Sequence, residues 1–261
     1  MRQTSVCIVD ETGRMVREMR AASEPHALVT ALEEFGQPME RIGLEACFLA
    51  AWLHDGLRSA GLAAVCIETR QANAAMKTMP NKTDRNDGRA LAQIMRTGWF
   101  RQVHVKSRQC RQWRSLLVAR RTVMNEMRSI ENVARAILRE GGIKLGTPSR
   151  ADFVGKVRDI ISGEQLLIAL VEPLLAVLAT TLEQFAHLTK QVLDVAKNET
   201  TCRQLMSVPG VGPITALAFR ATIDRPRSLS SIARCRCPSR SDAIPLSNRR
   251  DRYPGQDQPM W

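Results

Sequence analysis

Residues 4–19 read TSVCIVDETGRMVREM, and this stretch decides the fold class of the first third of the chain. Apolar and polar side chains alternate over residues 4–9, as they do in a half-buried β-strand. A turn with a glycine follows at residues 10–13, and residues 15–19 form a second run of strand type. Two such runs joined by a short turn predict an antiparallel β-hairpin.

Helices and strands alternate after this hairpin. Ser23 and Pro25 predict a helix that continues through Phe35 and stops at Gly36, since serine caps helices and proline fits their first turn. Strands are expected at residues 41–46 and 63–68, and helices at 48–59 and 84–96. Thr83 caps the last helix and Gly98 ends it. Without a glycine-rich phosphate loop, this order predicts a mixed sheet in an α/β domain.

The middle of the chain is basic and helical. Residues 99–144 hold 11 basic and three acidic side chains, within a chain of net charge +12. Apolar residues recur every seven positions here and again over 167–195, where Pro173 predicts a kink or a restart. The two seams, joined by residues 141–163, predict an antiparallel coiled-coil hairpin or one shared between subunits. The first seam combines Leu116, Val123, Ile130 and Ile137 with Trp113, Arg120, Met127 and Ala134.

The last third contains a turn and a tail. Residues 209–213 read PGVGP between two apolar stretches, which indicates either a phosphate-binding helix-hairpin-helix turn or a plain helix–helix turn. Residues 225–261 contain eight Arg, six Ser and five Pro, a composition typical of disorder.

Composition narrows the class of protein. The chain has 261 residues, 44% of them hydrophobic, and seven scattered cysteines, which favour a globular protein in a reducing compartment. The N-terminus lacks an apolar signal region, and Glu172 and Pro173 interrupt the apolar stretch 166–182. We therefore expect a cytoplasmic protein without a membrane span. The basic block favours a polyanion as partner, ahead of a merely solvated helix face.

Three carboxylates are the candidate chemical groups. Asp84 and Asp87 lie three residues apart at a helix start, where they share a face and bind a metal together, or where they stabilise the helix dipole. Glu45 ends a buried strand, a costly place for a carboxylate unless it is paired or bound to a cation. The three are plausible ligands for two Mg²⁺ ions that act on a phosphodiester. The aromatic content of 4% argues against a stacking platform for single strands.

Several motifs in order resemble the insertion-sequence-110 family of transposases over residues 3–225. They read VCIVDETGR at 6–14, IGLEA at 42–46, KTDRNDGRALA at 82–92, LVAR at 117–120 and PGVGP at 209–213. The resemblance implies an RNase H-like (RuvC-type) domain with a DEDD carboxylate tetrad that needs Mg²⁺, in which Glu45, Asp84 and Asp87 are catalytic metal ligands. It also implies a coiled-coil middle, DNA recombination, and an RNA from the same element that guides target choice.

Two departures from the family pattern shape the expected fold. The first aspartate of the tetrad lies upstream of the segment that begins at Arg2, and the tail 225–261 replaces a domain with a functional serine, as a frameshift would. We expect an incomplete RNase H-like domain without its first strand. Two strand edges should then lack a partner, and the chain should be marginally stable and inactive in strand cleavage.

The expected organisation follows from these features. An RNase H-like domain spans 1–98, a basic coiled-coil region 99–200, a helix-hairpin-helix-like segment 201–224 and a disordered tail 225–261. The function is that of a bacterial transposase, with DNA and element-encoded RNA as partners, a homo-oligomer through the coiled coil, and a place in the cytoplasm or on the nucleoid. The alternative is a non-catalytic nucleic-acid-binding coiled-coil protein. The expected nucleic-acid-binding residues are Arg108, Arg111, Arg114, Arg120, Arg121, Arg128, Gly210 and Gly212.

Overall fold

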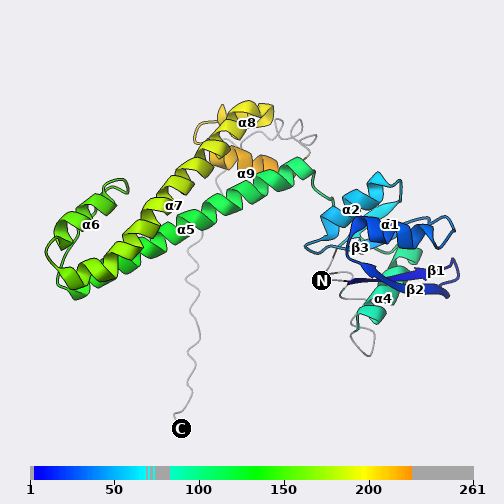
Figure 1. Ribbon diagram of the computed structural model, residues 1–261. Helices are drawn as coiled ribbons and strands as arrows, with labels where there is room; N and C mark the ends of the chain where they lie inside the picture. The colour runs from blue at the N-terminus through cyan, green and yellow to red at the C-terminus, as the bar shows by residue number, and fades with distance from the viewer. Residues whose placement is uncertain (1–2, 69, 71–72, 74–82, 225–261) are drawn as a thin grey trace, which may run out of the picture. The chain divides into compact units, whose positions relative to one another are not determined.

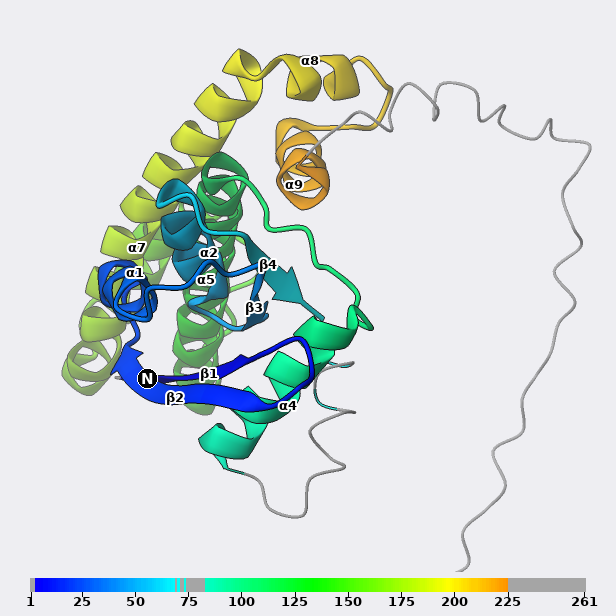
Figure 2. The same ribbon diagram turned by 90° about the vertical axis from the view of Figure 1, so that its right-hand side faces the viewer.

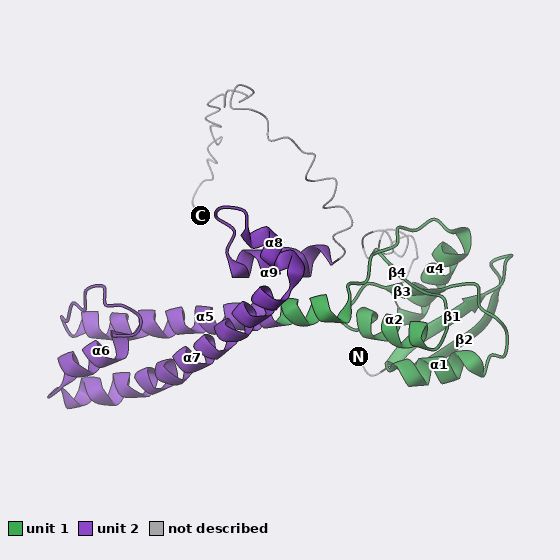
Figure 3. Cartoon of the chain, turned by 90° about the horizontal axis from the view of Figure 1, so that it is seen from above, with its two compact units in different colours: residues 1–115 green, residues 116–261 purple. Residues whose placement is uncertain are grey.

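The computed structural model describes residues 3–68, 70, 73 and 83–224 (Figure 1). The chain divides into two compact units, residues 1–115 and 116–261, shown in different colours in Figure 3. The boundary falls inside one long helix, α5 (Arg108–Glu140). The predicted disordered tail, residues 225–261, lies outside the described residues, as does Lys82.

Unit 1 begins with the predicted hairpin. Strand β1 (Gln3–Val9) pairs antiparallel with β2 (Met15–Ala22), and Val6 lies opposite Met19. In the turn, the Gly13 amide donates to the Asp10 carbonyl at 3.0 Å, and Gly13 adopts a φ of 87°. A left-handed backbone of this kind favours glycine, so the glycine in the sequence fixes the place of the turn.

The alternation that follows confirms the expected order of elements. It consists of α1 (Pro25–Glu33), β3 (Ile42–Glu45), α2 (Ala50–Ser59), β4 (Ala64–Ile67) and α4 (Asp84–Thr97). The start of α1 differs from expectation, because Glu24 is its N-cap residue and no side chain caps it. The hydroxyl of Ser23 instead hydrogen-bonds to that of Thr4 at 2.8 Å, so it is engaged with β1.

The four strands form two separate sheets, where one mixed sheet was expected. β3 pairs in parallel with β4, and β1 pairs only with β2 among the described strands. Strands β1 and β3 both line a cavity of about 480 Å³, together with side chains of α1 and α4. They still share one apolar core, in which Val6 and Leu44 pack around Leu28, Leu32 and Leu57. Residues of β1 and β3 therefore line the same cavity, and within the described residues each of these strands pairs with one other strand only.

Unit 2 is helical and is built on α5 and α7 (Gln165–Asn198), which run side by side in Figures 1 and 3. Their direction is antiparallel, since Arg120 hydrogen-bonds to Thr189 at 2.9 Å and Gly141 lies beside Leu167. The fully buried residues at the contact are Met127, Ala134 and Leu138 of α5 and Val171, Leu175 and Leu178 of α7. Four of them, Met127, Ala134, Val171 and Leu178, belong to the predicted seams, whereas Leu138 and Leu175 each lie one position beyond a seam residue. The antiparallel helical hairpin is confirmed, and its supercoiling stays a prediction.

The connection between the two long helices contains a helix that the sequence did not predict. Helix α6 (Phe153–Ile161) buries Phe153, Val157 and Ile161 in the core of the hairpin. Helix α7 then continues through Pro173 without a restart. The chain ends its described part with α8 (Thr200–Met206) and α9 (Pro213–Ile223), and Glu199 joins them by accepting from Arg220 at 3.0 Å.

Helix α7 is also long and apolar enough to cross a membrane, judged by length and composition. Its apolar side chains have a second explanation, because Val171, Leu175 and Leu178 fill the core that α5 and α6 share with it. Others stay exposed, among them Leu166, Leu170 and Val177. Core helices and membrane spans meet the same criterion, so this helix alone does not indicate a membrane protein.

Candidate functional site

Glu45 ends strand β3 at the carboxyl edge of the parallel pair. The register places it opposite Ile67 of β4, and the next amide, that of Ala46, donates to the Ile67 carbonyl at 3.3 Å. Its side chain is half-buried. The structure therefore places Glu45 at a strand end, as the sequence predicted. Ligand-binding groups of α/β sheets gather at such ends.

Asp84 and Asp87 lie in the first turn of α4. Thr83 caps the helix by accepting from the Asn86 amide at 3.2 Å, and the Asp87 amide donates to the Thr83 carbonyl at 2.9 Å. Asp84 is exposed and Asp87 is half-buried. Negative side chains in a first turn stabilise a helix through its dipole by about 0.3–1 kcal/mol each. The carboxylates are well placed for that structural role and for binding a cation.

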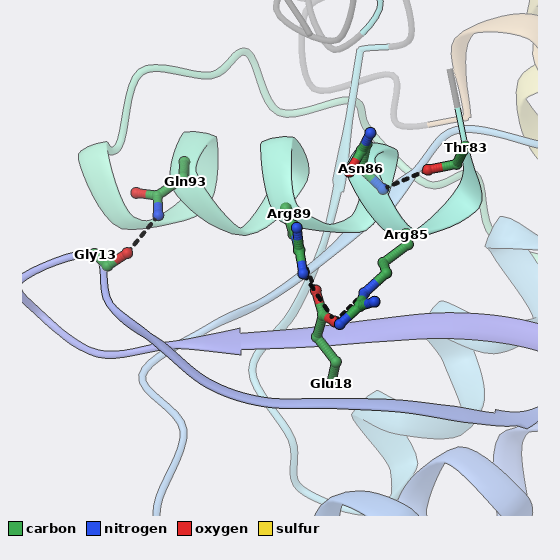
Figure 4. A network of polar contacts seen from close by, with 7 residues as sticks. All are labelled: Gly13, Glu18, Thr83, Arg85, Asn86, Arg89 and Gln93. Carbon is green, nitrogen blue, oxygen red and sulfur yellow. Dashed lines mark hydrogen bonds and ion pairs between the residues drawn. The ribbon is translucent and has the colours of Figure 1, made fainter. Parts of the chain in front are cut away.

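A polar network fixes α4 on the hairpin (Figure 4). Glu18 of β2 accepts from both Arg85 and Arg89, and Gln93 donates to the Gly13 carbonyl at 2.6 Å. The hydrogen bond from Arg89 lowers the pKa of the Glu18 carboxyl. Figure 2 shows α4 running beside the two strands.

The same network determines which way the first turn of α4 faces. The side chains that hold the hairpin recur every four residues along one face of the helix. Asp84 and Asp87 lie about 100° and 160° around the axis from Arg85, in the same direction, given 3.6 residues per turn. The two aspartates are therefore on another side of α4 than the ion pairs.

The three candidate carboxylates are not gathered into one ligand set. Within the described residues, no group of three or more His, Cys, Asp or Glu side chains could hold a metal ion. The structure brings Asp84 and Asp87 into one helical turn and leaves Glu45 on a separate element. The shared metal site stays a prediction.

The candidate nucleic-acid surface on α5 divides into two groups of arginines. Arg111 is paired with Asp55 and donates to the Lys106 carbonyl at 2.6 Å. Arg120 lies over the ring of Phe185, 4.6 Å from its centroid, besides its bond to Thr189. These two arginines hold the helices in place. The others, exposed along α5, are Arg108, Arg114, Arg121 and Arg128.

Arg114, Arg121 and Arg128 form a row, here called the arginine row. They lie seven residues apart, which is two helical turns or about 10.5 Å along the axis. Because 3.6 residues make a turn, residues seven apart point to nearly the same side. The arginine row thus presents three guanidinium groups along one line of the helix surface.

Gly210 and Gly212 lie in the turn between α8 and α9. Gly210 has a φ of 87°, a value that favours glycine, and Gly212 is the N-cap residue of α9. A side-chain carbon at either position would meet no other atom within 4 Å. The helix–turn–helix is confirmed, and a phosphate-binding role of its amides stays a prediction.

Sequence reasoning missed the exposed aromatic side chains of unit 1. Phe48 is fully exposed at 104%, Trp52 of α2 is 51% exposed and Trp99 is 82% exposed. The low aromatic content of the whole chain argued against an aromatic surface, but an average does not show where the few aromatic residues lie. Phe48 lies in the turn before α2, and for Trp52 the available signal was its position out of phase with the buried Leu53 and Leu57.

Comparison with known proteins supplies the class. A family model described as Transposase, of the insertion-sequence-110 type with a DEDD carboxylate set, matches residues 1–142. This match covers more than half of the chain, and the chain belongs to this transposase family. The resemblance seen in the motifs is thereby confirmed.

A curated relative points the same way. The chain is 25% identical over 223 residues to the transposase for insertion sequence element IS1111A of Coxiella burnetii (strain RSA 493 / Nine Mile phase I). The aligned region covers 84% of this chain and 59% of the relative. The chain therefore spans less than two thirds of the relative's length.

Proposed function

We propose that this chain binds DNA in the transposition of an insertion sequence, with the arginine row of α5 as its contact to the phosphate backbone. The observation that carries the proposal is the row itself, three exposed guanidinium groups spaced along one side of a helix in a transposase-family chain. Each arginine that neutralises a phosphate releases condensed counterions, so binding should weaken steeply with salt.

The test is the salt dependence of binding to a DNA duplex, followed by fluorescence anisotropy. Neutralising the arginine row (Arg114→Gln, Arg121→Gln, Arg128→Gln) should reduce the slope of log K against log salt by about 2.7, or about 0.9 for each phosphate contact. The matched control removes three positive charges from α7 and α8, with Lys190→Gln, Lys197→Gln and Arg203→Gln. Equal losses in both triple variants would show that only net charge matters and would contradict the proposal.

The family implies a requirement for a divalent metal, and we propose Glu45, Asp84 and Asp87 as the Mg²⁺ ligands that serve strand cleavage and joining in an active member of the family. For this chain itself the sequence predicts that cleavage is lost. Carboxylate oxygens are the ligands that Mg²⁺ takes in proteins, and two of the three share a helical turn. Nicking of a supercoiled plasmid that depends on Mg²⁺ and disappears in Asp84→Asn would support this role. Nicking that survives both Asp84→Asn and Glu45→Gln would exclude these residues as the catalytic set.

A second candidate is a nucleic-acid-binding protein without cleavage activity. The separation of Glu45 from the aspartates favours it, because described residues form no three-ligand group. In this case duplex binding persists, nicking is absent with any divalent metal, and Asp84→Asn changes only helix stability.

We further propose the partners and location that the family resemblance implies. The partners are DNA, an RNA of the same element and a second copy of this chain, in the bacterial cytoplasm and on the nucleoid. The exposed apolar residues Leu166, Leu170 and Val177 of α7 support self-association, because they leave apolar surface uncovered on the helical hairpin. Sedimentation equilibrium measures this self-association, and a variant with all three residues changed to Gln should be a monomer.

A further inference from the structure

The side of α5 that faces away from α7 is exposed within unit 2. Figure 3 shows α7 running along α5, and the buried Met127 and Ala134 mark the side of α5 that packs there. Asn125 and Asn132 each lie two residues before one of these, about 160° around the helix axis. Both asparagines are exposed. Their amides therefore point away from the core of the helical hairpin.

Arginines and hydroxyls flank the two asparagines on this side. Asn125 and Asn132 each follow an arginine of the arginine row by four residues, about 40° around the axis, and a hydroxyl residue lies about 60° further in the same direction. The order around the helix is thus arginine, amide and hydroxyl, and it repeats after seven residues. This surface, here called the amide face, consists of Arg121, Thr122, Asn125, Arg128, Ser129 and Asn132, all exposed.

The two carboxylates within residues 121–132 lie at the margins of the amide face. Glu126 and Glu131 are each the chain neighbour of an asparagine, so each lies about 100° away from that asparagine around the axis. Glu131 is also paired with Arg150 at 3.0 Å. The centre of the face is therefore neutral or basic, and its charge suits a polyanion such as the phosphate backbone of DNA.

The side chains of the amide face match the groups that a DNA duplex presents in its major groove. An asparagine amide both donates and accepts, and it pairs with N6 and N7 of adenine through two hydrogen bonds. Arginine and hydroxyl side chains contact phosphates. The major groove of B-DNA admits an α-helix, whereas the major groove of duplex RNA is too deep and narrow for side chains to read. Duplex DNA therefore suits this face better than duplex RNA.

We propose that the amide face of α5 enters the major groove of duplex DNA, where Asn125 and Asn132 each read an adenine. The asparagines are seven residues or about 10.5 Å apart, so the two adenines lie about three base pairs apart at 3.4 Å each. The arginine row contacts the phosphates along one wall of the groove, and the hydroxyls contact the other wall. This inference rests on the proposed function, since it assumes that α5 binds DNA. It adds a sequence preference, which phosphate contacts alone do not give.

The experiment is a binding selection with the full chain on a DNA duplex library that has a random central stretch. Sequencing of the bound duplexes should show two enriched adenines about three base pairs apart. Asn125→Ala should remove the preference at one adenine and Asn132→Ala at the other. Each should lower the discrimination there roughly 5- to 140-fold, the factor equal to about 1–3 kcal/mol for one bidentate pair. Fluorescence anisotropy on the selected and a scrambled duplex measures this factor.

Three further variants separate base reading from other effects. Asn125→Arg should change the preferred base from adenine to guanine, because a guanidinium pairs with O6 and N7 of guanine. The matched control is Asn198→Ala, at an exposed asparagine of α7, which should leave both preferences intact. Neutralising the arginine row should weaken binding of all sequences alike and leave the selected sequence unchanged. Selection of the wild-type sequence by Asn125→Ala or Asn125→Arg would overturn the inference.

The outcomes also separate this inference from the proposed function. If the wild type binds duplexes with steep salt dependence but enriches no sequence, base reading is wrong and DNA binding stands. If the wild type binds no duplex, the proposed function fails together with the inference. Duplex RNA that competes as well as the selected DNA would also overturn it and identify RNA as the ligand. Because both asparagines are exposed and alanine favours helix, the alanine variants should melt no lower than the wild type.

Discussion

Gly56 of α2 is the position where one added methyl group should be most damaging to unit 1. A side-chain carbon there would lie 2.3 Å from Cβ and 2.8 Å from Cγ of Pro25, the first residue of α1. Ordinary contact begins at about 3.4 Å, so the two helices would have to separate by roughly 1 Å. The proline ring cannot rotate away, because its torsions are fixed.

Two effects oppose each other in Gly56→Ala. Alanine in a helix interior is better than glycine by about 1 kcal/mol. Overpacking of a close contact costs about 1–3 kcal/mol, and an overlap with a rigid ring belongs at the upper end. We expect a net loss of about 2 kcal/mol, which for a unit of this size lowers the melting temperature by roughly 8–16 °C.

The matched control is Gly88→Ala in α4 of the same unit. Its added carbon would meet Cβ of Cys7 at 3.7 Å, an ordinary contact, so only the helical gain of up to about 1 kcal/mol remains. Calorimetry gives the two melting temperatures, and amide hydrogen exchange over residues 50–59 locates the effect. The steric reasoning is refuted if both alanine variants are as stable as the wild type or more stable.

Three other predictions follow from single contacts. The pKa of Glu18 is lowered because Arg89 and Arg85 hydrogen-bond to the charged carboxylate, so its stabilising effect is present above its usual pKa near 4.5 and is lost as pH falls through the lowered value. The Glu18→Gln variant should be less stable than the wild type at pH 7 and should lose less stability on acidification, as measured by urea denaturation at several pH values. Phe153→Ala removes a fully buried ring from the core of unit 2 and should cost about 3–5 kcal/mol, whereas a loss below about 1 kcal/mol would show that α6 is not part of that core. Burial raises the pKa of the Cys66 thiol to about 11, so only about one thiol in a thousand is ionised at pH 8; mass spectrometry after brief alkylation should find the exposed Cys47 modified and Cys66 intact, and early modification of Cys66 would contradict its burial.

The local signals in the sequence predicted most of the elements. Thr83 and Gly98 bound α4 as expected, because a threonine side chain accepts from the first free amides and a glycine adopts the left-handed backbone at the helix end. The heptad seams likewise predicted four of the six fully buried residues where α5 and α7 meet, and missed Leu138 and Leu175. The prediction that Ser23 caps α1 was wrong, because its hydroxyl hydrogen-bonds to that of Thr4, 19 residues away in the sequence.

What the sequence did not predict depends on contacts between distant residues. Helix α6 is short, and its three buried side chains are stabilised by packing against α5 and α7. A helix of this length depends on such contacts, so the local pattern of residues 141–163 did not predict it. The split into two sheets likewise depends on how β1 and β3 are spaced, which no local pattern encodes. For the candidate site, sequence placed Asp84 and Asp87 in one turn, while their relation to Glu45 depends on how α4 packs on the hairpin through Glu18.

The unbroken course of α5 through the boundary at residues 115 and 116 governs how the protein can be dissected. A protease cuts extended, accessible backbone, and an intact helix offers none, so limited digestion should not release the two units as fragments. A recombinant piece that stops at Ser115 would keep only two turns of α5, too short to hold helical form by themselves. Fragments for separate study should therefore overlap, each carrying α5 in full.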